Sequence, residues 1–194
     1  GFTSTPICST DGIYYANRDT GQLYSTNLAT GATTQIGWLT PTNTFVNNES
    51  YRGDVAVFSD GRMFTIGFDS AQTTGRLFSV DRSTATATLI ATHPGYIFAG
   101  LEAASDGFLY AVSANSAQRG IYRIDPVSGV ITTLFNTPFS YVGDIAQQGG
   151  NIFYATAWGN VAPITDGSSG HLIRIDMTAQ TATDLGAIAT DGGS

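Results

Sequence analysis

The sequence predicts an all-β protein, a β-propeller built from four-stranded antiparallel blades. Three observations predict this fold. Four segments of the chain align with one another without a gap, a turn followed by an aromatic strand precedes each segment, and helix signals are poor throughout. Four antiparallel strands in a repeat of about 40–50 residues are the signature of a propeller blade.

The four aligned segments each hold an alternating apolar run, a tight turn and a Thr-rich second run. They are LYSTNLATGATTQIG (23–37), LFSVDRSTATATLIA (77–91), IYRIDPVSGVITTLF (121–135) and LIRIDMTAQTATDLG (172–186). Alternation rich in β-branched residues predicts strands, here called c and d. An Asn or Asp side chain can bond the backbone two residues on, so we expect one to start each turn: Asn27, Asp81, Asp125 and Asp176. Gly31 and Gly129 can supply a positive φ in two of these turns.

A second hairpin precedes each segment. Its marks are the stretches TDGIYYA (10–16), SDGRMFT (59–65), SDGFLYA (105–111) and QGGNIFYA (148–155). Asp-Gly and Gly-Gly pairs are strong hairpin signals, so these stretches predict a turn between strands a and b. We expect one equivalent position in strand b to hold Tyr15, Phe64, Tyr110 and Phe153.

The length of 194 residues suits one domain, 1–194. Within it the repeats cover about 5–37, 53–91, 100–135 and 143–186, and a tail covers 187–194. The sequence does not decide how the ring of blades is completed. Four blades can close a tight ring, the array can continue into a fifth blade, or a second chain can complete the ring through the terminal strands. Pairing that does not close would give a filament.

The pattern DG-x-LY … LYxID-xxTG-xxT-xIG resembles the degenerate blades of secreted bacterial propellers, the broad YVTN/NHL-like group. The resemblance covers nearly the whole chain. It implies a propeller fold and an exported protein. It implies no single activity, because the group contains lyases, lactonases, adhesins and scaffold modules.

The composition disfavours some classes of binding partner. The net charge is −7 and all eight cationic side chains are Arg. Such a chain lacks the basic surface that would attract nucleic acids or anionic membranes. It also has no apolar run long enough to span a bilayer. The single Cys8 cannot form an internal disulfide. These features favour a secreted or cell-surface protein.

Loop lengths indicate where a ligand would bind. The a–b and c–d turns are minimal, whereas the d–a and b–c connections are long and must emerge on one face of the propeller. Long loops on a rigid scaffold often carry function, so we expect an interaction face with six aromatic or imidazole side chains. These are Trp38, Tyr51, His93, Tyr96, Tyr141 and Trp158. The alternative is that they cap the boundaries between blades.

Three acids lie near the start of strand a: Asp54, Glu102 and Asp144. Strand a lines the central channel of a propeller, and convergent carboxylates suit a hard cation such as calcium. The alternative is that each carboxylate caps a turn or accepts backbone N–H bonds. No required cofactor is predicted.

Two classes of function follow. The first is a non-enzymatic extracellular binding or structural module that recognises a glycan, a surface protein or another copy of itself, as a homo-oligomer or filament. The second is a secreted lyase or lactonase that uses a divalent cation at the channel acids. No nucleophile elbow, Walker loop or dinucleotide-binding loop is present, and this favours the first class.

Overall fold

The computed structural model describes residues 13–16, 21–41, 54–69, 71–115 and 117–188. These residues form sixteen strands in four sheets and contain no helix. Accordingly, this part of the chain has no helix that could cross a membrane.

Each sheet is one blade, with its strands in chain order. Blade 1 contains β1 (Ile13–Ala16), β2 (Gln22–Thr26) and β3 (Thr33–Trp38). Blade 2 contains β5 (Val55–Val57), β6 (Met63–Phe68), β7 (Thr74–Val80) and β8 (Thr86–Pro94). Blade 3 contains β9 (Phe98–Ala103), β10 (Leu109–Ser113), β11 (Gly120–Ile124) and β12 (Ile131–Asn136). Blade 4 contains β13 (Tyr141–Gly149), β14 (Ile152–Gly159), β15 (Ser168–Asp176) and β16 (Thr181–Ala187). The predicted four-stranded antiparallel blade is confirmed in blades 2, 3 and 4, and the described residues of blade 1 form three of its strands.

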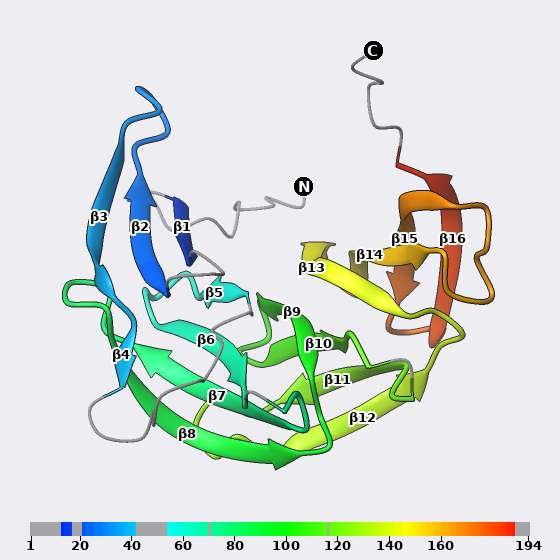
Figure 1. Ribbon diagram of the computed structural model, residues 1–194, viewed down its shortest axis with the longest axis horizontal. Helices are drawn as coiled ribbons and strands as arrows, with labels where there is room; N and C mark the ends of the chain where they lie inside the picture. Colours follow the sequence, from blue (N-terminus) through cyan, green and yellow to red (C-terminus); the bar gives the residue numbers. More distant parts are fainter. Residues whose placement is uncertain (1–12, 17–20, 42–53, 70, 116, 189–194) are drawn as a thin grey trace.

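The four blades stand side by side around a common axis and form an open arc (Figure 1). The strands β5, β9 and β13 lie on the inner side of the arc, and β8, β12 and β16 lie on its outer side. Blades 1 and 4 lie on opposite sides of the opening. Among the described residues blades 1 and 4 do not meet, and closure of the ring stays a prediction.

Blade 2 has an additional edge strand that the sequence did not predict. The strand β4 (Thr40–Pro41) runs parallel to β8, with Thr40 opposite Thr86. The chain leaving blade 1 thus covers the outer edge of blade 2. Two residues with a Pro carry no strand signal of their own, and an edge position is where a sheet accepts Pro.

The turns between strands c and d form as predicted. The Asn27 Oδ1 accepts the N–H of Ala29 at 2.9 Å, and equivalent bonds start at Asp81, Asp125 and Asp176. Gly31 and Gly129 have φ of 70° and 72°. In the other two turns the same conformation is adopted by Ala85 (φ 60°) and Gln180 (φ 53°).

The predicted alignment of strand b is wrong by one residue in two blades. Strand c positions Ser25, Ser79, Arg123 and Arg174 are equivalent, and their cross-strand partners are Tyr14, Phe64, Tyr110 and Tyr154. Tyr15 and Phe153 therefore occupy the neighbouring position in their strands. In blade 4 Ala146 pairs with Tyr154 as Ala56 pairs with Phe64 in blade 2 and Glu102 with Tyr110 in blade 3, so the a–b connections are equally long. Gly150-Asn151, and not Gly149-Gly150, therefore takes the place of the Asp-Gly pairs.

Three apolar clusters hold adjacent blades together. Leu23 packs between blades 1 and 2, Leu77 between blades 2 and 3, and Ile121 between blades 3 and 4, and all three are fully buried. In each case this residue, the first of the aligned sequence segment, points to the following blade. The next residue points back to the preceding blade, as Phe78, Tyr122 and Ile173 show. The period of two along a strand therefore gives every blade one forward face and one backward face.

Candidate functional site

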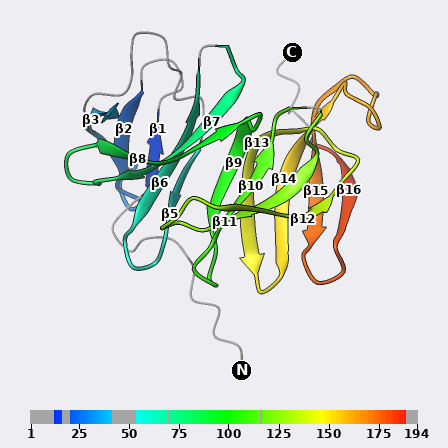
Figure 2. The same ribbon diagram turned by 90° about the horizontal axis from the view of Figure 1, so that it is seen from below.

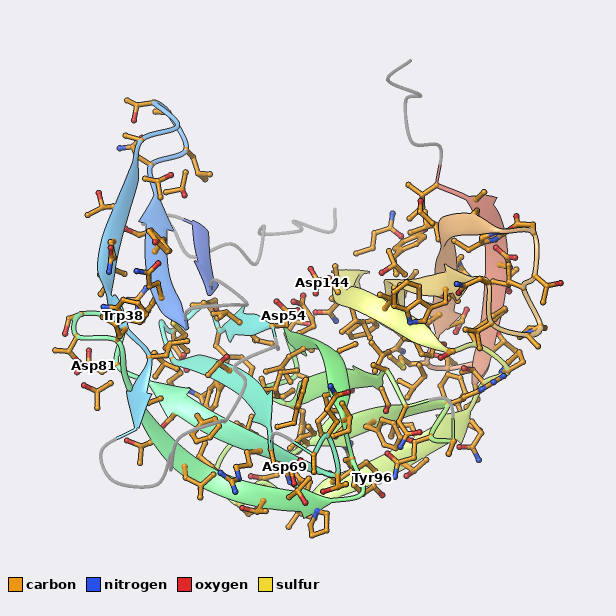
Figure 3. The ribbon with its side chains drawn as sticks, viewed as in Figure 1. Trp38, Asp54, Asp69, Asp81, Tyr96 and Asp144 are labelled. Atoms are coloured by element: carbon orange, nitrogen blue, oxygen red, sulfur yellow. The ribbon has the colours of Figure 1, made fainter. Side chains whose placement is uncertain are left out.

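The long β14–β15 connection of blade 4 lies on one rim of the arc. Seen edge-on, the molecule shows the β14–β15 loop at its upper edge and the tight β13–β14 and β15–β16 turns at its lower edge (Figure 2). Trp38 lies at the end of β3, near Asp81 of the c–d turn of blade 2 (Figure 3), and a Cβ on its neighbour Gly37 would lie 3.1 Å from the Thr84 carbonyl oxygen of that turn. Trp158 lies near the end of β14. The exposed fractions of Trp38 and Trp158 are 52% and 39%.

Tyr96 and His93 lie at the β8–β9 connection, where blade 2 meets blade 3. The half-buried Tyr96 ring stacks on Phe98 with centroids 5.8 Å apart. His93 is buried, and its Nε2 donates to the Gly129 carbonyl at 2.7 Å while its Nδ1 is buried without a hydrogen-bond partner. Burial lowers the pKa of His93, so the imidazole is neutral at pH 7. Its bond to a turn of blade 3 ties the two blades together.

Tyr141 lies at the start of β13 and is completely buried. Its hydroxyl lies 2.9 Å from the Thr137 Oγ1. Tyr141 and His93 therefore offer no surface to a ligand, whereas Trp38, Trp158 and part of Tyr96 do. Tyr51, the sixth predicted residue, lies outside the described residues.

Two of the three predicted channel acids come together. Asp54 precedes β5 of blade 2, and Asp144 lies on β13 of blade 4; their side chains point into the same inner region of the arc (Figure 3). The two carboxyls are in hydrogen-bonding contact. The Asp54 carboxyl also accepts the N–H of Val55 at 2.8 Å and that of Leu101, on blade 3, at 3.1 Å. Burial and then the Asp144 carboxyl raise the pKa of Asp54 well above its usual range. The pair therefore holds a proton at pH values where an exposed Asp is ionised.

Glu102 lies two residues beyond the position equivalent to Asp54, which Gly100 occupies in blade 3. Its Oε1 accepts the N–H of Gln147 on blade 4 at 3.1 Å. Burial, together with the nearby Asp144, raises its pKa to about 7. Asp54 and Glu102 thus both bind backbone N–H groups of the following blade.

The fit of these acids to calcium can be judged from their partners. Asp54, Glu102 and Asp144 each accept at least one backbone N–H bond, which occupies oxygen lone pairs that a cation would need. Within the described ranges, no three His, Cys, Asp or Glu side chains form a group that could hold a metal ion. In this arrangement the residues do not fit a calcium ion, and calcium binding stays a prediction.

The sequence analysis missed a cluster around His171 in blade 4. The His171 Nε2 lies 2.8 Å from an Asp166 oxygen, and its Nδ1 lies 2.9 Å from both oxygens of Asp184. The imidazole side chain is only 8% exposed. Asp184 and then Asp166 raise the pKa of His171, and the pKa of Asp166 falls to about 2. The cluster ties the β14–β15 loop to β16, and the only sequence signal was the place of His171 and Asp184 on adjacent strands.

Comparisons with known proteins identify the fold. No protein-family model matches the chain, and no curated protein matches it in sequence. Solved β-propeller structures do match. TolB from Acinetobacter baumannii is 18% identical over 96% of this chain and 45% of its own, with a TM-score of 0.60. A chain of a nidogen/laminin complex is 11% identical over 90% of this chain and 60% of its own, with a TM-score of 0.62. Virginiamycin B lyase from Staphylococcus aureus is 15% identical over 92% of this chain and 53% of its own, with a TM-score of 0.56.

The chain thus spans about half the length of the structures that it matches. At these identities the likeness concerns the fold alone. The fold is a β-propeller, and the function has to be argued from the site.

Proposed function

We propose that the protein is a non-enzymatic extracellular binding module that presents the rim of long connections to a glycan. The observation that carries the proposal is the exposure of Trp38 and Trp158 at the ends of β3 and β14. They are the two Trp residues of the chain, and large aromatic side chains are normally covered in a folded domain. Their flat faces offer rigid contact area at a small entropic cost.

The roles of the titratable side chains support this proposal. His93 bonds a turn of blade 3, His171 bonds two Asp residues, and Asp54 and Glu102 bond backbone N–H groups across blade boundaries. General acid–base catalysis needs a group within reach of a substrate proton. These groups instead stabilise the blades and their packing.

A glycan fits the rim better than a charged partner does. The chain carries a net charge of −7, and nucleic acid and anionic membranes are therefore poor partners. A neutral sugar ring brings no charge to the site and packs its apolar face on an indole ring. A surface protein is the other partner class that aromatic anchors can serve.

The experiment compares the wild type with the double variant Trp38→Ala/Trp158→Ala on a glycan array. The matched control is Leu28→Ala, which removes an exposed apolar side chain (61% exposed) from the β2–β3 turn. We expect the double variant to lose at least about tenfold in affinity, roughly 1.4 kcal/mol, and the control to bind as the wild type does. Equal binding of all three proteins would refute the role of the rim.

A lyase or lactonase is the second candidate. The fold likeness to virginiamycin B lyase and the meeting of Asp54 with Asp144 favour it. It requires a divalent cation at acids that now bind protons and N–H groups, so calcium titration is its first test.

A further inference from the structure

The β14–β15 loop of blade 4 is attached on two sides. On the side of blade 3, the Arg119 Nη1 donates to the Ala162 carbonyl at 2.6 Å, and Ile164 is buried in the cluster between blades 3 and 4. On the side of β16, Asp166 contacts the His171 imidazole, which also contacts β16. An imidazole changes its charge near neutral pH, so the attachment to β16 can respond to a proton.

The His171 imidazole lies between two carboxylates, one at each ring nitrogen. Its Nδ1 lies 2.9 Å from both oxygens of Asp184, and its Nε2 lies 2.8 Å from the Asp166 Oδ2. An ionised carboxylate only accepts hydrogen bonds, so both ring nitrogens must donate, and only the imidazolium has two N–H groups. When His171 is neutral, one nitrogen turns its lone pair toward a carboxylate and that contact is lost.

Asp166 is the carboxylate that can move away. Asp184 lies within β16, where it pairs with Ile173 of β15, and its Oδ1 also accepts the Gly186 N–H at 2.8 Å. Asp166 lies on the loop and its side chain is 49% exposed, so water can replace the imidazole as its partner. We therefore expect the neutral imidazole to keep Asp184 and to lose Asp166.

The elements packed around His171 place two charged groups against it, among the described residues. β14 places Ala157 opposite His171, β16 places Ala187 and Asp184 there, and the loop contributes Asp166. Asp184 and then Asp166 raise the pKa of the imidazole, and burial opposes them. The imidazolium therefore persists above pH 6.5, the ordinary pKa of His.

We propose that the β14–β15 loop is a pH-sensitive strap. A proton on His171 holds the Asp166 end of the loop against β16, and loss of that proton releases this end while Arg119 and Ile164 keep the other end on blade 3. The loop begins just after Trp158, so the proton also changes the surface beside that exposed side chain. The strap does not depend on glycan binding, because it concerns only the position of the loop.

Hydrogen exchange followed by NMR between pH 5 and pH 9 tests the strap. The reporters are the Gly167 amide, which donates to the Gly159 carbonyl at 3.1 Å, and the Ser168 amide, which donates to the Asp166 Oδ1 at 2.9 Å. In the wild type we expect their protection factors to fall at least about tenfold, with the midpoint of the His171 titration. Amides in the middle of β15 should stay protected, which shows that blade 4 remains folded.

Asp166→Asn and Asp184→Asn are the decisive variants. A carboxamide both donates and accepts hydrogen bonds, so it can bind either nitrogen of a neutral imidazole. In each variant the two reporter amides should therefore stay protected up to pH 9. The control is Asp176→Asn, which changes an acid five residues beyond His171 at a place that Asn27 occupies in blade 1. The control should lose protection as the wild type does.

Three results would overturn the proposal. The first is a wild type whose reporter amides stay protected up to pH 9. The second is an Asp166→Asn variant that loses protection as the wild type does, because the release would then not come from the contact between carboxylate and imidazole. The third is a simultaneous loss of protection in the middle of β15, because the whole blade would then open.

Discussion

The carboxyls of Asp54 and Asp144 meet although they belong to blades 2 and 4. Gly100 of the intervening blade lies between their strands, and a Cβ there would be 2.7 Å from the Gly143 oxygen and the Ile145 nitrogen. The small residue lets β9 approach β13 closely. The inner strands of three blades are thereby joined around one acid pair.

The buried acids Asp54 and Glu102 make the folded protein less stable as the pH rises. The pKa values of Asp54 and Glu102 are raised above their ordinary values of 3.8 and 4.5. The folded state therefore binds more protons than the unfolded state, and stability present below about pH 4 is lost as the pH rises through the folded pKa values, about 7 for Glu102. We expect Asp54→Asn to raise the free energy of unfolding at pH 8 by about 1–2 kcal/mol relative to the wild type.

Urea unfolding at pH 5 and pH 8 measures this effect. Asp60→Asn is the control, because Asp60 is exposed and its pKa is lowered, chiefly by the Arg62 N–H. The control should not gain stability at pH 8. An Asp54→Asn variant that is less stable than the wild type at pH 8 would contradict the protonated pair.

The two His residues should titrate in opposite directions from 6.5. Two carboxylates raise the pKa of His171, whereas burial lowers that of His93. The stability that His171 contributes is thus present below pH 6.5 and lost as the pH rises through its folded pKa. For His93 the stability is present above pH 6.5 and lost as the pH falls.

NMR titration of the imidazole protons measures both values directly, because the chain has two His residues. Asp184→Asn should lower the pKa of His171 and leave that of His93 unchanged. Two midpoints on the same side of 6.5 would disagree with these contacts.

Gly100→Ala should destabilise the protein by about 1–3 kcal/mol, the usual cost of overpacking. The new methyl group would overlap backbone atoms of blade 4, which cannot move aside without separating β9 from β13. Gly170→Ala is the matched control, since its Cβ would lie 3.5 Å from the nearest atom. Chemical denaturation of both variants makes the comparison, and equal losses would show that the close approach has no special cost.

Calcium binding at the channel acids would have to displace the shared proton. Calcium should then raise the melting temperature more at pH 8 than at pH 5, and the gain should vanish in Asp54→Asn/Asp144→Asn. Differential scanning calorimetry measures the melting temperature in the presence of calcium and in the presence of a chelator, and the difference tests the calcium site. Identical melting temperatures under both conditions would rule out the calcium site and weaken the case for a cation-dependent lyase.

The fold could be predicted because each repeat carries local sequence signals for its strands and turns. The hairpin turns at Asn27, Asp81, Asp125 and Asp176 need only neighbouring residues, and they form as expected. Strand b was misplaced in blade 4 because Gly149-Gly150 was aligned with the Asp-Gly turns, whereas the strand pairing places Gly150-Asn151 there.

The candidate site could be predicted only in part. Residue type and loop length pointed to Trp38 and Trp158, which are exposed, and equivalent strand starts suggested that Asp54 and Asp144 would converge. The burial of Tyr141 and His93 could not be read from the sequence, because it depends on the packing of one blade against the next. The contact of His93 with Gly129 is likewise formed between blades.

A crystal structure of the protein tests the central claim most directly. The account predicts radial blades in which Leu23, Leu77 and Ile121 are each buried against the following sheet, with the Asp54 and Asp144 side chains in contact at the inner strands. Two stacked sheets, or a linear coil of strands that keeps β5 far from β13, would contradict it.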